Sequence, residues 1–141
     1  MQLNNPIFIN QTDADLRYVN TTGDTINGNL SLNSNQLVDY VPQSINETTN
    51  FVISGNDNGR IILANSASQI TGTIVSGNAT GFNTTIIQIG AGQIFVTGSG
   101  INASIPILSY NNQYKTAGAG ATVSVLHTGN NRYIMYGNTS L

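Results

Sequence analysis

The chain has 141 residues and a formal net charge of −2, and only 7% of its residues are charged. Soluble domains carry about 25% charged residues, whereas here 21 asparagines and 16 threonines take much of their place. Such a composition favours a rigid, β-structured viral or adhesive protein over a cytosolic enzyme, because weakly charged surfaces suit contacts between copies of a chain. The length allows one domain, or a small core with a non-globular stalk.

The few charges are unevenly distributed along the chain. All six acidic residues precede residue 58, and beyond it the only charged residues are Arg60, Lys115 and Arg132. This shift predicts a domain boundary near residues 42–50. Three dispersed cations are too few for a nucleic-acid footprint, so no nucleic-acid partner is expected. The absence of cysteine excludes disulfides and thiolate metal sites.

Neither a membrane segment nor a leader is expected. No stretch approaches 18 consecutive apolar residues, so we predict no membrane insertion. Met1 is followed by Gln2-Leu3-Asn4-Asn5, with neither a basic region nor an apolar core, so no secretory signal is predicted. A chain that acts outside the cell without such a signal would fit a virion component released by lysis.

The first 41 residues predict an arm and a stalk. Residues 1–11 are largely polar with one apolar patch, which indicates an extended arm that docks onto another protein. Residues 12–19 predict a short helix with Thr12 as its N-cap and Asp13 and Asp15 in its first turn. At about two turns, this helix would need partners to be stable.

Residues 23–40 alternate apolar and polar side chains, with Ile26, Leu30 and Leu32 on one face. This period of two predicts a strand with one buried face. Strands this short cannot form a monomeric core, so we predict that residues 12–41 form an intertwined trimeric stalk with β-prism-like strands. The alternative is a loose N-terminal linker.

The remainder of the chain predicts an all-β head. Residues 42–50 indicate a connector, since Pro42 favours an extended conformation before it. Residues 51–141 contain eight short β-runs separated by turns rich in glycine and asparagine. Their spacing predicts an antiparallel β-sandwich or a jelly-roll-like head. We expect the glycine pairs at 90–92 and 98–100 to form hairpin turns.

Two segments resemble a known class of proteins. Residues 13–30, DADLRYVNTTGDTINGNL, resemble the DLRY…NTTGDTxxGNL element of bacteriophage tail-fibre and receptor-binding proteins. More loosely, the order of glycines and β-runs over residues 58–137 looks like a C-terminal domain found in phage tail fibres. The resemblance implies a parallel homotrimer on the virion, with residues 1–11 contacting another virion protein.

The sequence contains no catalytic constellation, and we expect no enzyme activity, no cofactor and no metal. His127 is the only histidine, so a site with several imidazoles cannot be built within one chain. We expect it at a strand end or turn; the alternative is that three copies hold an ion on an axis. A serine hydrolase would need a nearby acid and a Gly-x-Ser-x-Gly elbow, and neither follows residue 58.

The predicted recognition surface combines tyrosine rings with amide side chains. Tyrosine offers a stacking face and a hydroxyl, and asparagine pairs a donor with an acceptor, which suits sugar recognition. The candidate residues lie at 110–115 and, second, around 130–133: Tyr110, Asn111, Asn112, Tyr114, Lys115, Arg132 and Tyr133. The alternative is an ordinary polar loop whose tyrosines pack on the head or at a trimer interface.

Together these features predict a viral fibre protein that attaches the virion to a host-surface component. We expect this component to be a glycan, with a host protein as the alternative. The main alternative is a trimeric head-fibre or capsid-decoration protein with a mechanical role. A bacterial adhesin fragment and a fibre-tip enzyme are two further classes. Both tail and capsid use trimeric β-modules, so the sequence does not separate them.

Overall fold

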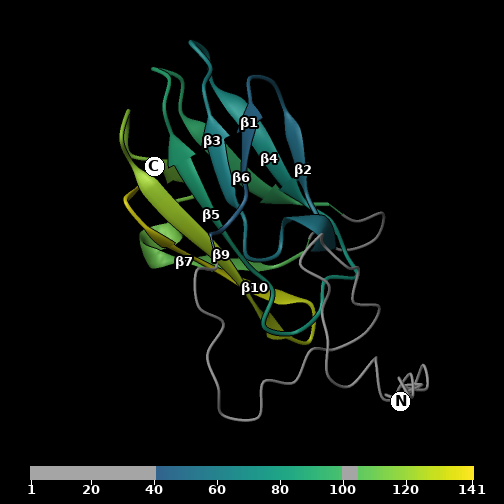
Figure 1. Ribbon diagram of the computed structural model, residues 1–141. Helices are drawn as coiled ribbons and strands as arrows, with labels where there is room; N and C mark the ends of the chain where they lie inside the picture. Colours follow the sequence, from purple (N-terminus) through teal and green to yellow (C-terminus); the bar gives the residue numbers. More distant parts are fainter. Residues whose placement is uncertain (1–40, 100–104) are drawn as a thin grey trace, which may run out of the picture. The chain divides into compact units, whose positions relative to one another are not determined.

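The structure is a computed structural model that describes residues 41–99 and 105–141 (Figure 1). These residues form two β-sheets and two single turns of 3-10 helix, η1 (Gly55–Asp57) and η2 (Tyr110–Asn112). The predicted all-β class is therefore confirmed. The predicted arm, residues 1–11, and all but the last residue of the predicted stalk, 12–41, lie outside the described residues.

The strands of the two sheets are hydrogen-bonded in a defined order. Sheet A consists of β1 (Ser44–Glu47), β3 (Ile61–Ala64), β5 (Asn83–Gln88), β9 (Thr122–Gly129), β10 (Arg132–Gly137) and β7 (Ile107–Ser109). Sheet B consists of β11 (Thr139–Ser140), β8 (Lys115–Thr116), β6 (Ile94–Gly98), β4 (Ile70–Ile74) and β2 (Phe51–Ile53). Residues 44–47, predicted as part of a connector, thus form an edge strand that pairs with β3.

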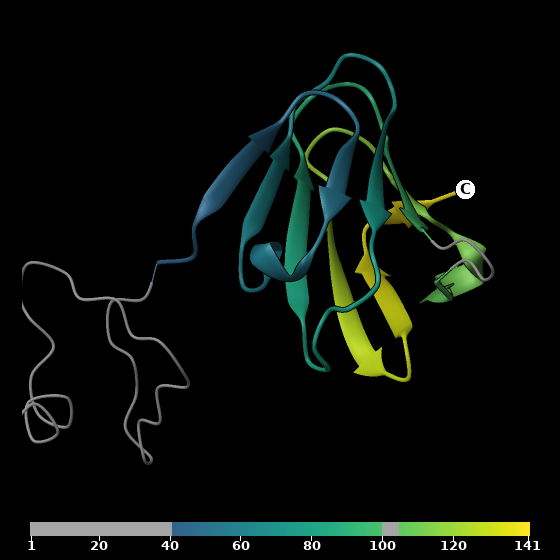
Figure 2. The same ribbon diagram turned by 90° about the vertical axis from the view of Figure 1, so that its right-hand side faces the viewer.

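The first six strands are wound as a β-solenoid. Successive strands alternate between the sheets: β1, β3 and β5 pair in parallel in sheet A, and β2, β4 and β6 pair in parallel in sheet B. Their arrows point one way in sheet A and the opposite way in sheet B (Figure 2). A parallel pair needs a crossover connection, and here each crossover is the intervening strand of the other sheet. The predicted antiparallel sandwich or jelly-roll arrangement was wrong for these six strands.

The last five strands are mostly antiparallel. The β9–β10 hairpin joins sheet A through β5, and β8 and β11 extend sheet B from β6. Only β7 departs from this pattern, because it runs parallel to β10 at the edge of sheet A. The described chain therefore has two parts, a coil half (β1 to β6) and a C-terminal half (β7 to β11).

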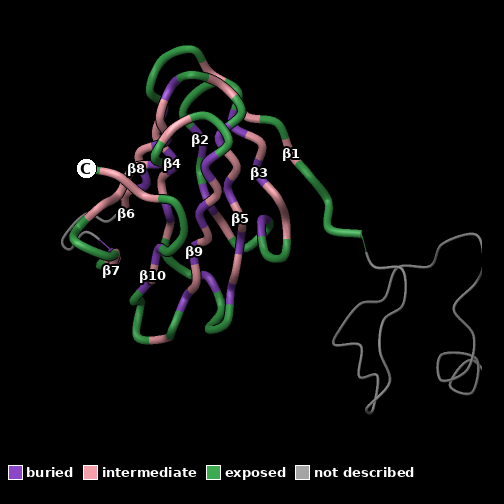
Figure 3. The backbone as a smooth tube through the Cα atoms, turned by 90° about the vertical axis from the view of Figure 1, so that its left-hand side faces the viewer, coloured by how far each residue is buried: buried purple, intermediate pink, exposed green. Residues whose placement is uncertain are grey.

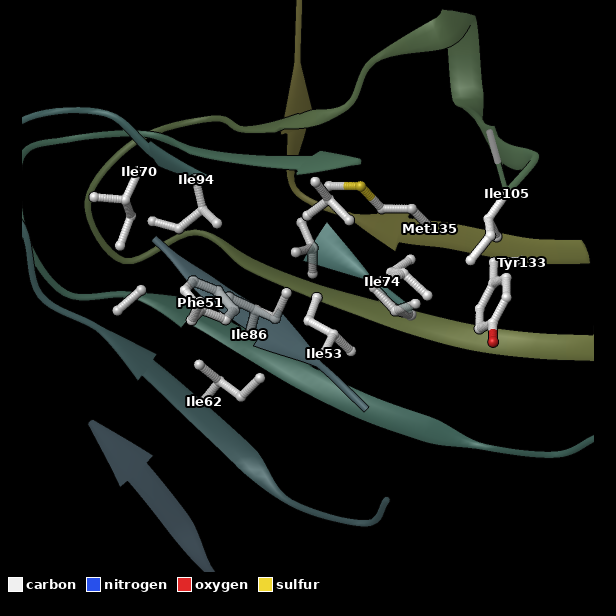
Figure 4. Close-up of a cluster of buried hydrophobic side chains, with 14 of the residues drawn as sticks. Phe51, Ile53, Ile62, Ile70, Ile74, Ile86, Ile94, Ile105, Tyr133 and Met135 are labelled. Atoms are coloured by element: carbon white, nitrogen blue, oxygen red, sulfur yellow. The ribbon is translucent and has the colours of Figure 1, made fainter. Parts of the chain in front are cut away.

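The core lies between the sheets. Along β3, β4, β5 and β9 every second residue is buried, and the burial pattern alternates along the tube in Figure 3. Ile53, Ile62, Ile74, Ile86 and Ile94 are all fully buried, and side chains from both sheets meet in the cluster of Figure 4. Complete burial of such a side chain stabilises the fold by about 1.5–3 kcal/mol.

The second and third coils repeat every 24 residues. Ile61 pairs with Thr85 in sheet A and Gly72 pairs with Val96 in sheet B, each 24 positions apart. The turns between the sheets stack in the same register: a Cβ on Gly90 would lie 2.2 Å from the Ser66 carbonyl oxygen, and one on Gly92 would lie 2.0 Å from that of Ser68. Glycine allows this close approach of two backbones. The 90–92 segment is thus a solenoid turn that leads from β5 in sheet A to β6 in sheet B, and the predicted hairpin there was wrong.

Candidate functional site

The predicted recognition residues are placed unequally by the structure. Tyr110, Asn111 and Asn112 form the η2 turn directly after β7, and all three are exposed. Asn111 and Asn112 adopt left-handed backbone conformations, with φ of 51° and 55°. Asparagine tolerates this region better than most residues, which explains the Asn-Asn pair at this turn.

Hydrogen bonds fix the 110–115 loop to the rest of the C-terminal half. The Thr139 hydroxyl donates to Gln113 Oε1 over 2.9 Å, and the Gln113 amide donates to the Tyr110 carbonyl over 3.1 Å. The Ser109 hydroxyl donates to the Gln113 carbonyl, and the Tyr114 hydroxyl donates to Asn112 Oδ1 over 3.2 Å. A loop held in this way loses little conformational freedom when it binds a ligand.

A groove opens on one side of this loop, between β7, η2 and β10. Its volume is about 360 Å³, and the residues that line it include Leu108, Ser109, Tyr110, Ile134, Tyr136 and Thr139. Tyr110 is 77% exposed and Tyr136 48%, so both aromatic side chains are available to a ligand. We call this feature the tyrosine groove. Its volume lies at the small end of the range for ligand sites, which suits one or two sugar rings.

The tyrosine groove is uncharged and bordered by hydroxyl groups. None of the described residues that line it is Asp, Glu, Lys or Arg, and Ser109, Tyr110, Tyr136 and Thr139 each carry a hydroxyl. Aromatic faces pack against the apolar faces of sugar rings, and hydroxyls pair with sugar hydroxyls. The groove is thus chemically suited to a neutral saccharide.

Tyr136, which was not among the predicted residues, lines the tyrosine groove, whereas the predicted Tyr133 lies in the interior. Tyr133 is fully buried, and its ring stacks on His127 with 4.5 Å between the centroids. Because β7 runs parallel to β10, with Ser109 opposite Met135, the residue near Tyr110 is Tyr136. Residues 132–136 are apolar or aromatic apart from Arg132, so alternation alone did not indicate which tyrosine faces outward.

The two predicted cations lie outside the tyrosine groove. Arg132 is exposed at the start of β10, four residues before Tyr136, which corresponds to about 13 Å along a strand. Lys115 lies in β8 of sheet B, opposite Phe95. The structure therefore brings Tyr110 together with Tyr136, and it separates this pair from Lys115, Arg132 and Tyr133.

A second groove lies on the other side of the 110–115 loop. It has a volume of about 330 Å³ and is lined by Phe95, Thr97, Ile105, Pro106 and Tyr114, among others. It presents one tyrosine ring where the tyrosine groove presents two. The predicted Tyr114 thus lines a different groove from Tyr110, together with Phe95.

His127 occupies an interior position. It lies in β9, is only 7% exposed, and its Nδ1 is 2.9 Å from the Ala79 carbonyl oxygen. Among the described residues, neither its Nε2 nor the Tyr133 hydroxyl has a hydrogen-bond partner. A histidine buried within one chain in this way does not suit an ion shared by three copies on an axis.

The described part of the chain contains no group of three or more His, Cys, Asp or Glu side chains positioned to hold a metal. No helix in residues 41–99 and 105–141 has the length and hydropathy needed to cross a membrane. Comparison of the chain with protein-family models, with curated proteins and with solved structures finds no match.

Proposed function

We propose that this protein is a homotrimeric virion protein of the tail-fibre class, which attaches the particle to a glycan on the host surface. The resemblance of residues 13–30 to phage fibre elements supports the assignment to this class. The observation that carries the binding function is the tyrosine groove, where Tyr110 and Tyr136 line one uncharged, hydroxyl-bordered hollow. In this proposal, residues 1–11 contact another virion protein and the C-terminal half faces the host.

Binding at each groove is proposed to be weak and to gain strength from repetition. A single small groove that holds one or two sugar rings fits a millimolar dissociation constant, about 4 kcal/mol of binding free energy. Three linked copies on one particle convert later contacts into intramolecular events and raise the overall avidity. Repeated envelope polysaccharides present ligands in the multivalent form that this arrangement requires.

The test compares the full chain with a Tyr110→Ala/Tyr136→Ala variant for binding to purified bacterial envelope polysaccharides. Loss of binding by the double variant, with an unchanged oligomer mass in light scattering, is the expected result. Tyr114→Ala is the matched control, because Tyr114 belongs to the same loop but lines the other groove. Loss of binding by Tyr114→Ala alone would move the site to that groove.

Two other outcomes would count against the proposal as a whole. A stable monomer near 14.9 kDa in light scattering would contradict the homotrimer. A trimer that binds no host cell or envelope polysaccharide would favour the capsid-decoration role instead.

A further inference from the structure

Two of the hydroxyl groups that border the tyrosine groove are already hydrogen-bonded within the protein. The Ser109 hydroxyl donates to the main-chain carbonyl of Gln113, and the Thr139 hydroxyl donates to Gln113 Oε1 over 2.9 Å. Both acceptors are carbonyl oxygens without a proton of their own, so Ser109 and Thr139 supply the protons of these bonds. A hydroxyl has one proton and two lone pairs. Toward a ligand in the groove, Ser109 and Thr139 therefore act as acceptors.

The main chain around Gln113 is fixed where it receives these two protons. On one side, the Gln113 amide donates to the Tyr110 carbonyl over 3.1 Å and closes the η2 turn. On the other side, the Tyr114 carbonyl accepts from the Val96 amide of β6 over 2.8 Å. Gln113 itself is partly buried. The two oxygen atoms that take up the protons are thus held by the fold, and the direction of both hydrogen bonds is set before a ligand arrives.

The two tyrosine hydroxyls of the groove are not restricted in this way. Tyr110 and Tyr136 are exposed, and a phenol group both donates and accepts hydrogen bonds. A ligand group of either kind can therefore pair with them, and the two rings contribute mainly stacking area. Discrimination between donor and acceptor groups of a ligand consequently depends on Ser109 and Thr139.

We propose that the tyrosine groove selects neutral sugars that donate hydroxyl protons to Ser109 and Thr139, with Gln113 as the positioning residue that sets the direction of these bonds. This inference rests on the proposed glycan binding and names the class of sugar. The carboxylate of a uronic acid has no proton to donate and would face the lone pairs of both hydroxyls, in a groove without a charged lining residue. Sugars acylated or methylated at the bonding hydroxyls lack the proton as well and are excluded for the same reason.

The first test changes the ligand. The full chain is titrated with the methyl glycosides of glucose, galactose, mannose and glucuronic acid, and binding is followed by the amide chemical shifts of residues 108–113 and 134–139. Each neutral glycoside that binds is then compared with its deoxyfluoro analogues, because fluorine is close in size to a hydroxyl group but cannot donate. We expect fluorination at the bonding positions to weaken binding by about two- to tenfold, the range of one hydrogen bond.

The second test changes the acceptor. Thr139→Val removes the hydroxyl, and we expect it to weaken binding of the neutral glycoside by about two- to tenfold while the analogue fluorinated at the bonding position loses less than about twofold. A merely structural role of Thr139 would lower both affinities equally. Thr139→Ser restores the acceptor and should bind as the natural chain does. Thr128→Val is the matched control, because the Thr128 hydroxyl also donates to a carbonyl, that of Arg132 over 3.1 Å, but does not line the groove.

The third test changes the positioning residue. Gln113→Glu keeps an oxygen that can only accept, so Thr139 still donates to it and the preference for the neutral glycoside over the glucuronic acid glycoside should persist. Gln113→Met has a similar length but replaces the amide with a thioether, a weak acceptor, which frees the Thr139 proton for a ligand. We expect Gln113→Met to lower that preference by about two- to tenfold. Thermal melting and circular dichroism confirm that each variant is folded.

The failure of this inference can be distinguished from the failure of the proposed function. If envelope polysaccharide binds through the groove, but Thr139→Val and Gln113→Met leave affinity and preference unchanged, the proposed function stands and the inference is overturned. Binding of the glucuronic acid glycoside in place of the neutral ones would overturn it as well. If the natural chain binds neither polysaccharide nor any of the glycosides, both the proposed function and the inference fail.

Discussion

The coil half and the C-terminal half of the molecule use the same two sheets for different purposes. The coil half, β1 to β6, is built on buried isoleucines and on glycines that let one turn stack on another. It contains no tyrosine in its described residues. The C-terminal half, β7 to β11, contains four tyrosines, of which Tyr110 and Tyr136 are exposed. A regular repeat supplies the rigid support, and the irregular strands beside it supply the candidate binding surface.

This difference shows how the fold positions the groove. A solenoid coil contacts only its neighbours, so its geometry repeats and its side chains serve mainly packing. The mostly antiparallel strands that follow do not continue the 24-residue repeat, so the loops that connect them can vary in composition. We therefore expect changes in the coil half to act on stability and changes near η2 to act on binding.

The largest effect is expected from a cavity in the coil half. Ile74→Ala, at a side chain with no exposed surface, should lower the free energy of unfolding by about 2–5 kcal/mol. Val52→Ala is the control, because Val52 is 57% exposed on the neighbouring strand and should cost less than about 1 kcal/mol. Urea denaturation measures both values. Equal losses for the two variants would contradict the core as assigned.

The next effect concerns the stacked turns. Gly92→Ala would place a methyl group 2.0 Å from the Ser68 carbonyl oxygen, so the two turns must separate, at a cost of about 3 kcal/mol. Gly55→Ala is the matched control, since its nearest atom, Asn78 Oδ1, is 3.7 Å away and space is available. If Gly92→Ala melts at the same temperature as Gly55→Ala, the turns do not stack as described.

A buried polar contact joins the two halves. The Thr116 hydroxyl of β8 donates to Gln88 Oε1 at the end of β5 and accepts from the Ile94 amide over 2.9 Å. Thr116→Val keeps the shape but leaves these buried partners unpaired, which should cost about 2 kcal/mol. Thr116→Ser retains the hydroxyl and should cost less. The reverse order in thermal melting would show that the methyl group, not the hydrogen bonds, stabilises this junction.

The smallest effect is expected from salt, acting on glycan binding by the C-terminal half. No charged residue lines the tyrosine groove, so raising the salt from about 50 to about 500 mM should change the affinity by less than about twofold. The measurement is binding of the full chain to immobilised polysaccharide at both salt concentrations. A steep loss of binding would instead indicate contacts through Lys115 or Arg132.

The sequence predicted the strands better than their connections. The runs at Phe51–Ile53 and around β4, β5, β9 and β10 correspond to observed strands, because short apolar runs between glycine and asparagine turns are a local signal. Parallel pairing is not local, since it depends on which distant strands become neighbours. The 24-residue repeat was nevertheless present in the sequence: Gln69-Ile70 recurs as Gln93-Ile94, and Ala67 as Ala91.

The candidate site was predicted only in part for a similar reason. The composition of the 110–115 loop indicated exposed tyrosine and asparagine, and Tyr110 is exposed in the structure. Its neighbour Tyr136 is 26 residues away, and the parallel register of β7 and β10 brings the two together. In the same strand, Tyr133 faces the core and Tyr136 the surface, a distinction that depends on register.

Mapping the bound saccharide onto the backbone tests the central claim most directly, that the C-terminal half recognises a glycan while the coil half supports it. The measurement is the change in amide chemical shifts of the full chain on titration with an oligosaccharide from a polysaccharide it binds. We predict that the largest changes fall at residues 108–113 and 134–139, with residues 44–98 unchanged. Largest changes within residues 44–98, or none at Tyr110 and Tyr136, would contradict this division of roles.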